Sequence, residues 1–201
     1  MIYYMGMVGI AAFAVTGVMA AGKKNMDIFS IVLLGMITAL GGGTIRDILI
    51  DANPVFWMAD LTYLWVALAA SVVAFFLIRL ITPLFKLLLY VDAFGLALFT
   101  VLATQKTSAM GLPGPVAVVM GLVTGIAGGM IRDVLTQRQT LILAREFYAT
   151  PALIGAICIS VLDTAFPGHA YSHLYATGLI FILRGAAIQW GLYYPGWLML
   201  K

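Results

Sequence analysis

The chain alternates between long apolar stretches and short connections that contain Gly, Pro, Asn or Lys. A stretch of roughly 20 mostly apolar residues is long enough for a helix that spans a bilayer. Glycine and proline between such stretches mark turns. The pattern therefore predicts seven transmembrane helices, at about 2–21, 28–50, 61–82, 86–104, 114–136, 147–165 and 170–190.

The same pattern argues against a transmembrane β-barrel. The strands of a barrel alternate apolar and polar residues, whereas the run from Ala67 to Leu77 does not alternate. Backbone groups in lipid find no partner outside the protein, and a helix satisfies them within its own segment. We therefore expect an all-α membrane protein whose residues 1–201 form a single transmembrane domain.

Composition strengthens this expectation. The 201 residues are 63% hydrophobic and 9% charged, whereas soluble domains are about 45–50% apolar. A soluble fold of this length cannot hide so much apolar surface. The net charge of +3 comes from scattered basic residues, so nucleic acid is not an expected partner. Lys23 and Lys24 follow the first apolar run; this is the reverse of a signal peptide, so we expect a retained first span.

The basic residues also predict an orientation. With seven spans, the loops after the odd-numbered spans lie on one side of the membrane. That side receives Lys23, Lys24, Lys86, Arg138, Arg145 and Lys201. The loops of the other side receive only Lys106. Since basic residues favour the cytoplasmic side, we expect the N-terminus outside and the C-terminus in the cytoplasm.

An internal repeat is the strongest signal in the sequence. Residues 35–49 recur as residues 121–135 at an offset of 86 without a gap. The positions identical in both copies are, in the first copy, Gly35, Thr38, Gly42, Gly43, Ile45, Arg46, Asp47 and Leu49. The match predicts a duplicated three-helix unit, with repeat 1 at about 1–82, repeat 2 at about 86–166 and a seventh helix at about 170–190. Three helices are an odd number, so the second copy is inverted in the membrane, as in many transport proteins.

A glycine-rich triplet lies inside the second and fifth predicted spans. Its members in the two copies are Gly41, Gly42, Gly43, Ala127, Gly128 and Gly129. Each glycine costs about 1 kcal/mol in a helix relative to alanine, so the triplets predict that helices 2 and 5 are kinked or broken. A break frees carbonyls that suit a cation and N–H groups that suit an anion. Thr38 and Thr124 lie about one turn earlier, where their hydroxyls are expected to line a polar path or satisfy freed carbonyls.

Each triplet is followed by a charged pair, Arg46-Asp47 and Arg132-Asp133. Charges inside a span are costly and usually face the protein interior or an aqueous cavity. Because the two copies run antiparallel, we expect each arginine to pair with the aspartate of the other copy. The aspartates would then neutralise fixed positive charge at the waist of a pore.

A purely structural interpretation stays open. Small residues such as Gly35, Gly121 and Gly125 most often permit close helix packing, and the Arg-Asp pairs can act as buried clamps. The recurrence of glycines and charges together favours a functional role. Of the remaining charges, Asp92 is expected to cap the fourth span and Lys106 to lie at the interface with its stem in the membrane.

The sequence contains no nucleophile-base arrangement, phosphate loop or metal-ligand spacing. We therefore expect neither an enzyme nor a bound metal or cofactor.

The doubled motif resembles a known family. Gly41–Asp47 followed by Pro54–Trp57, and Gly128–Asp133 followed by Arg145–Ala149, are similar to the prokaryotic branch of the trimeric intracellular cation (TRIC) channels over essentially the whole chain. The resemblance implies two inverted three-helix units plus a last helix, and a homotrimer with one pore in each protomer. It also implies conduction of monovalent cations, chiefly potassium. Animal members carry a lysine-containing motif in place of the Arg-Asp pairs.

These observations predict a potassium-permeable channel in a bacterial inner membrane, with potassium or sodium ions and membrane lipids as partners. The predicted pore and gating residues are Thr38, Gly41, Gly42, Gly43, Arg46, Asp47, Thr124, Ala127, Gly128, Gly129, Arg132 and Asp133. The alternative is a secondary transporter of a small zwitterion such as glycine, which inverted repeats with broken helices suit equally well. A third hypothesis is a structural membrane subunit without a permeant.

Overall fold

The computed structural model describes residues 1–21, 26–78, 85–143, 147–169 and 171–195, and its assigned elements are helices. The long helices are α1 (Ile2–Ala21), α2 (Ile28–Leu49), α4 (Thr62–Leu77), α5 (Phe85–Ala109), α6 (Gly114–Leu135), α7 (Ala149–Ala165) and α8 (Ser172–Trp190). Two short elements lie in connections, the helix α3 (Phe56–Ala59) and the 3-10 helix η1 (Leu141–Leu143).

The predicted apolar segments each contain one long helix, and the all-helical prediction is confirmed. By length and composition, α1, α2, α5 and α6 can each cross a membrane, and α4 and α7 are shorter apolar helices. The fourth segment is longer than predicted, because α5 continues to Ala109. The short elements α3 and η1 were not expected from the hydrophobic pattern.

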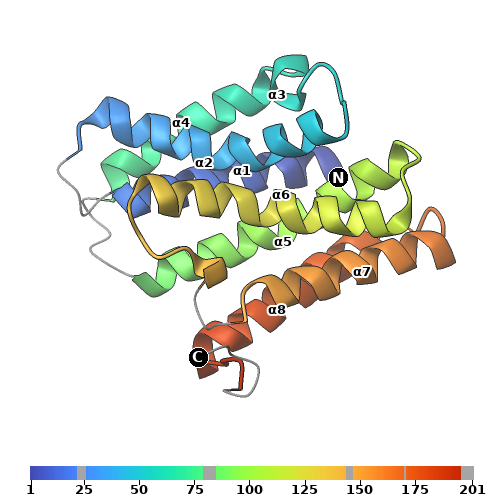
Figure 1. The fold of residues 1–201 in the computed structure, drawn as a ribbon. Coiled ribbons are helices and arrows are strands. Elements are labelled where there is room, and N and C mark those ends of the chain that lie inside the picture. The colour runs from blue at the N-terminus through green and yellow to red at the C-terminus, as the bar shows by residue number, and fades with distance from the viewer. Residues whose placement is uncertain (22–25, 79–84, 144–146, 170, 196–201) are drawn as a thin grey trace.

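The helices form two groups that meet along α2 and α6. In one group α1 packs against α2 and α4; in the other, α5 and α7 pack against α6. Figure 1 shows α1, α2 and α4 on one side of α5 and α6, and α7 and α8 on the other. The groups also touch where α1 crosses α5, and α8 packs against α5 and α7. The duplicated segments therefore lie side by side at the centre of the bundle.

The starts of α2 and α6 follow from local sequence. Asp27 caps α2, since its Oδ1 accepts the Ser30 N–H at 2.9 Å and its Oδ2 accepts the Ser30 hydroxyl at 2.9 Å. These hydrogen bonds hold the pKa of Asp27 below its usual range, and the bond from the Ser30 backbone N–H has the larger effect. Helix α6 begins at Gly114 with Pro115 in its first turn, where the missing N–H of proline costs nothing.

The contacts between the two groups are reciprocal. Phe13 of α1 and Phe99 of α5, which are 86 positions apart, stack with ring centroids at 5.3 Å. A Cβ on Gly9 would meet the Phe99 ring at 3.1 Å, and a Cβ on Gly95 would meet the Phe13 ring at 3.2 Å. Equivalent positions of the two copies therefore face one another at the crossing of α1 and α5.

Candidate functional site

The glycine triplets lie in unbroken helices. Helix α2 is continuous through Gly41–Gly43, and α6 is continuous through Ala127–Gly129, so neither helix is broken there, while a kink stays a prediction. The backbone groups keep their helical partners, which avoids the high cost of unsatisfied groups in a membrane. The triplets therefore free no carbonyls for a cation.

Glycine instead allows the two helices to touch. A Cβ on Gly42 would lie 2.3 Å from the Thr124 carbonyl oxygen, and a Cβ on Gly128 would lie 2.5 Å from the Thr38 carbonyl oxygen. Both contacts are with backbone, and they are again reciprocal. Close packing, which small residues permit in membrane helices, is thus the role that the geometry gives to these two glycines.

The two threonines lie at this crossing of α2 and α6. The Thr38 hydroxyl donates to the Leu34 carbonyl at 2.7 Å, and the Thr124 hydroxyl donates to the Met120 carbonyl at 2.6 Å. Both residues are buried. Their side-chain hydrogen bonds are therefore made inside their own helices.

The first charged motif forms a group that we call the Arg46 cluster: Arg46, Asp47 and Lys106. Arg46 Nε donates to Asp47 Oδ1 at 2.7 Å, and Lys106 Nζ reaches the same oxygen at 2.7 Å. Asp47 Oδ2 accepts the Phe56 N–H at 2.8 Å. The Arg46 guanidinium also lies 5.6 Å from the centre of the Phe56 ring, a distance that permits cation–π attraction.

The second motif forms the Arg132 cluster: Arg132, Asp133, Asp92 and Tyr148. Arg132 Nε donates to Asp133 Oδ1 at 2.9 Å, and Arg132 Nη1 donates to Asp92 Oδ1 at 2.6 Å. The Tyr148 hydroxyl donates to Asp92 Oδ2 at 3.0 Å. The side chains of Arg132 and Asp92 are 0% exposed, so this cluster is sealed from solvent.

Two expectations about these charges are wrong. Neither arginine pairs with the aspartate of the other copy; each pairs with its own neighbour in sequence. Asp92 does not cap α5, since it lies inside that helix and binds Arg132. The interfacial position of Lys106 stays a prediction, and the structure adds that its ammonium binds Asp47. The repeat alignment holds the missed signal: Gly6 and Ala20 occupy the equivalent positions, so both charges exist in one copy alone.

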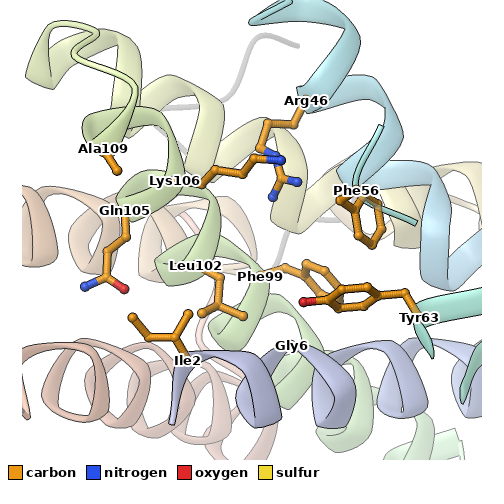
Figure 2. Close-up of a pocket in the computed structure, with 10 residues that line it drawn as sticks. All are labelled: Ile2, Gly6, Arg46, Phe56, Tyr63, Phe99, Leu102, Gln105, Lys106 and Ala109. Atoms are coloured by element: carbon orange, nitrogen blue, oxygen red, sulfur yellow. The ribbon is translucent and has the colours of Figure 1, made fainter. Parts of the chain in front are cut away.

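The two clusters differ in charge and in access. The Arg46 cluster holds two cations and one carboxylate, whereas the Arg132 cluster holds one guanidinium and two carboxylates. A cavity of about 420 Å³ reaches Arg46 and Lys106. Its remaining walls are aromatic and aliphatic side chains with Gln105, as Figure 2 shows. The described residues thus form an open vestibule at one motif and a packed, buried network at the other.

The sequence is similar to a known family of membrane proteins. The model of a family described as glycine transporter matches residues 3–79 and 89–164. The UPF0126 inner membrane protein YadS of Escherichia coli is 41% identical over 97% of this chain and 95% of its own length. A UPF0126 membrane protein of Vibrio cholerae is 38% identical over 100% of this chain and 84% of its own.

Solved structures agree with the sequence matches. The TRIC trimeric intracellular cation channel orthologue from Rhodobacter sphaeroides has a TM-score of 0.91 and 36% identity, over 95% of this chain and 98% of that one. The resemblance to prokaryotic TRIC channels that the doubled motif predicted is confirmed. This chain is therefore a membrane protein that belongs to the family described as glycine transporter and has the fold of the prokaryotic TRIC channels.

Proposed function

We propose that the chain is a channel for monovalent cations, principally potassium, with one pore inside each protomer of a homotrimer. The observation that carries this proposal is the vestibule that reaches a buried charged motif beside the crossing of α2 and α6. The similarity to the TRIC trimeric intracellular cation channel orthologue from Rhodobacter sphaeroides supports both the cation and the trimer. The pore would run past the two motifs predicted from the sequence.

The proposed architecture has seven spans, α1, α2, α4, α5, α6, α7 and α8, in one transmembrane domain. Two inverted three-helix units account for all but α8. The reciprocal contacts of Phe13 with Phe99 and of Gly42 and Gly128 with opposite backbones support the inversion. The two stretches matched by one family model, residues 3–79 and 89–164, fit two units.

The proposed orientation has the N-terminus outside and the C-terminus in the cytoplasm of a bacterial inner membrane. The basic loop residues support it through the positive-inside rule. Lys23, Lys24, Arg145 and Lys201 lie outside the described residues, so the argument from them rests on sequence. In this orientation the vestibule opens to the outside, and the buried Arg132 cluster forms the inner closure.

Opening the inner end would require the Arg132 cluster to separate. Its guanidinium binds carboxylates from α5 and α6, so α5 and α6 have to move apart or the ion pair has to turn aside. In this proposal the arrangement is a closed state of the channel, in which the Arg132 cluster blocks the inner end.

Single-channel recording from purified protein in planar bilayers tests the proposal. Under a potassium gradient we expect discrete openings that reverse near the potassium potential. Arg46→Gln should change the unitary conductance, because it removes a fixed charge from the vestibule wall. Lys86 is an exposed lysine at the opposite end of α5. The control is therefore Lys86→Gln, which should conduct like the wild type. A silent wild-type protein at all voltages would refute the channel proposal.

A glycine transporter is the second candidate. The description of the matching family favours it, as does a cavity whose Arg46 and Lys106 can hold a carboxylate. Uptake of radiolabelled glycine into proteoliposomes separates the candidates. Saturable uptake without single-channel openings would favour transport; openings without uptake would favour the channel.

A further inference from the structure

The Arg46 cluster has hydrogen-bonding capacity left over. Both carboxylate oxygens of Asp47 have partners, because its Oδ1 accepts hydrogen bonds from Arg46 and Lys106 while its Oδ2 accepts one from the Phe56 N–H. The two cations, in contrast, keep unused donors. In the part of the chain that the structure describes, no hydrogen bond involves Arg46 Nη1, and the Lys106 ammonium makes one of its three. The cluster therefore keeps an excess charge of +1 together with free N–H donors.

These donors face a cavity of suitable size. Arg46 and Lys106 are both among its lining residues, and its volume of about 420 Å³ lies in the range of small-molecule sites. Figure 2 shows the two cationic ends close together on one wall, with the Tyr63 hydroxyl directed into the same space. That hydroxyl has room because Gly6 lies beneath it, where a Cβ would meet the Tyr63 oxygen at 3.3 Å.

We propose that this vestibule is a binding site for a small monocarboxylate anion, held by Arg46 and Lys106 with Tyr63 as a further donor. The charge argues for a monoanion, since one negative charge balances the excess positive charge of the Arg46 cluster. The donor geometry argues for a carboxylate, because a planar guanidinium matches two carboxylate oxygens better than it matches a spherical halide.

The walls argue against a zwitterion. Among the described residues that line the cavity, none carries a carboxylate that could hold an ammonium group. Asp47, the sequence neighbour of Arg46, already accepts hydrogen bonds at both carboxylate oxygens. Aromatic and aliphatic groups, Phe56, Phe99 and Leu102 among them, form the rest of the surface. An apolar tail such as the methyl group of acetate fits such walls better than a charged amine does.

The Arg132 cluster provides the contrast within the same chain. It repeats the Arg-Asp motif but has Asp92 where the first cluster has Lys106, so its residual charge is −1. The anion site therefore exists at one motif only, because α5 contributes a lysine to the Arg46 cluster and an aspartate to the Arg132 cluster. The consequence for conduction rests on the proposed channel function: a bound anion would neutralise a vestibule that otherwise repels entering cations.

Equilibrium binding of ¹³C-labelled acetate to the full-length protein in nanodiscs, followed by saturation-transfer NMR, tests the site without any flux measurement. The variants are Lys106→Met, Lys106→Arg and Tyr63→Phe. Lys86→Met is the matched control, because it removes the same charge from an exposed position on the same helix. Size-exclusion profiles verify that each variant is folded.

We expect saturable acetate binding to wild type, Lys86→Met and Lys106→Arg. Lys106→Met should bind about tenfold more weakly, which is about 1.4 kcal/mol, and Tyr63→Phe should bind more weakly than wild type. Absence of saturable binding to wild type would overturn the proposal, as would equal affinity of Lys106→Met and Lys86→Met. Displacement of acetate by chloride at equal concentration would refute the carboxylate class. Tighter binding of glycine than acetate would show a zwitterion site instead. Each outcome is independent of whether channel openings are recorded.

Discussion

The three glycines of the first triplet should respond differently to alanine. A Cβ on Gly42 would lie 2.3 Å from a backbone oxygen of α6, so α2 and α6 have to separate by about 1 Å to reach ordinary contact. A Cβ on Gly41 would meet only the tip of the Ile131 side chain, at 2.8 Å, and one on Gly43 would meet the Phe56 ring at 2.6 Å. The backbone contact is the one that cannot yield by a side-chain rotation.

These contacts give an order of stability. Overpacking of this kind costs about 1–3 kcal/mol, while alanine itself stabilises a helix by up to about 1 kcal/mol relative to glycine. Gly42→Ala should therefore be the least stable of the three, Gly43→Ala intermediate and Gly41→Ala close to wild type. The second copy agrees, since Ala127 occupies the position equivalent to Gly41.

Thermal denaturation of the detergent-solubilised protein, followed by fluorescence-detected size exclusion, measures the order. Gly178→Ala is the control, because a Cβ there meets nothing within 4 Å. Each kcal/mol should lower the apparent Tm by about 2–4 °C in a chain of this size. Equal shifts for all three alanine variants would refute the close-approach argument, because they would point to a backbone break that depends on every glycine alike.

The charged clusters yield two further predictions. Arg132→Gln should destabilise the protein by about 3–5 kcal/mol, because it leaves two buried carboxylates without their cation. Arg46→Gln should lower the stability less, since Lys106 still pairs with Asp47. The same denaturation assay compares the two variants. Equal decreases in apparent Tm would contradict the proposed difference between the clusters. Tyr148→Phe should cost about 1.5–3 kcal/mol, because it removes a hydrogen bond to the Asp92 carboxylate, and an unchanged apparent Tm would refute a stabilising role.

The sequence alone determined that the chain is helical, and where its long helices lie. In lipid each helix satisfies its own backbone, so length and apolar composition suffice to locate it. The repeat was equally visible, since identical residues recur at one offset in 35–49 and 121–135. The short elements α3 and η1 escaped prediction because connections carry no such periodic signal.

Only the tertiary structure decided what the glycines and charges contact. A motif states which residue types are present, but their partners depend on how far each helix is rotated and shifted against its neighbours. Asp92 and Lys106 lie outside the recurring segments and reach the motifs from α5, across 40 and 59 positions of chain. For the same reason the sequence predicted breaks at the glycine triplets. In the structure the triplets lie where two continuous helices, α2 and α6, touch.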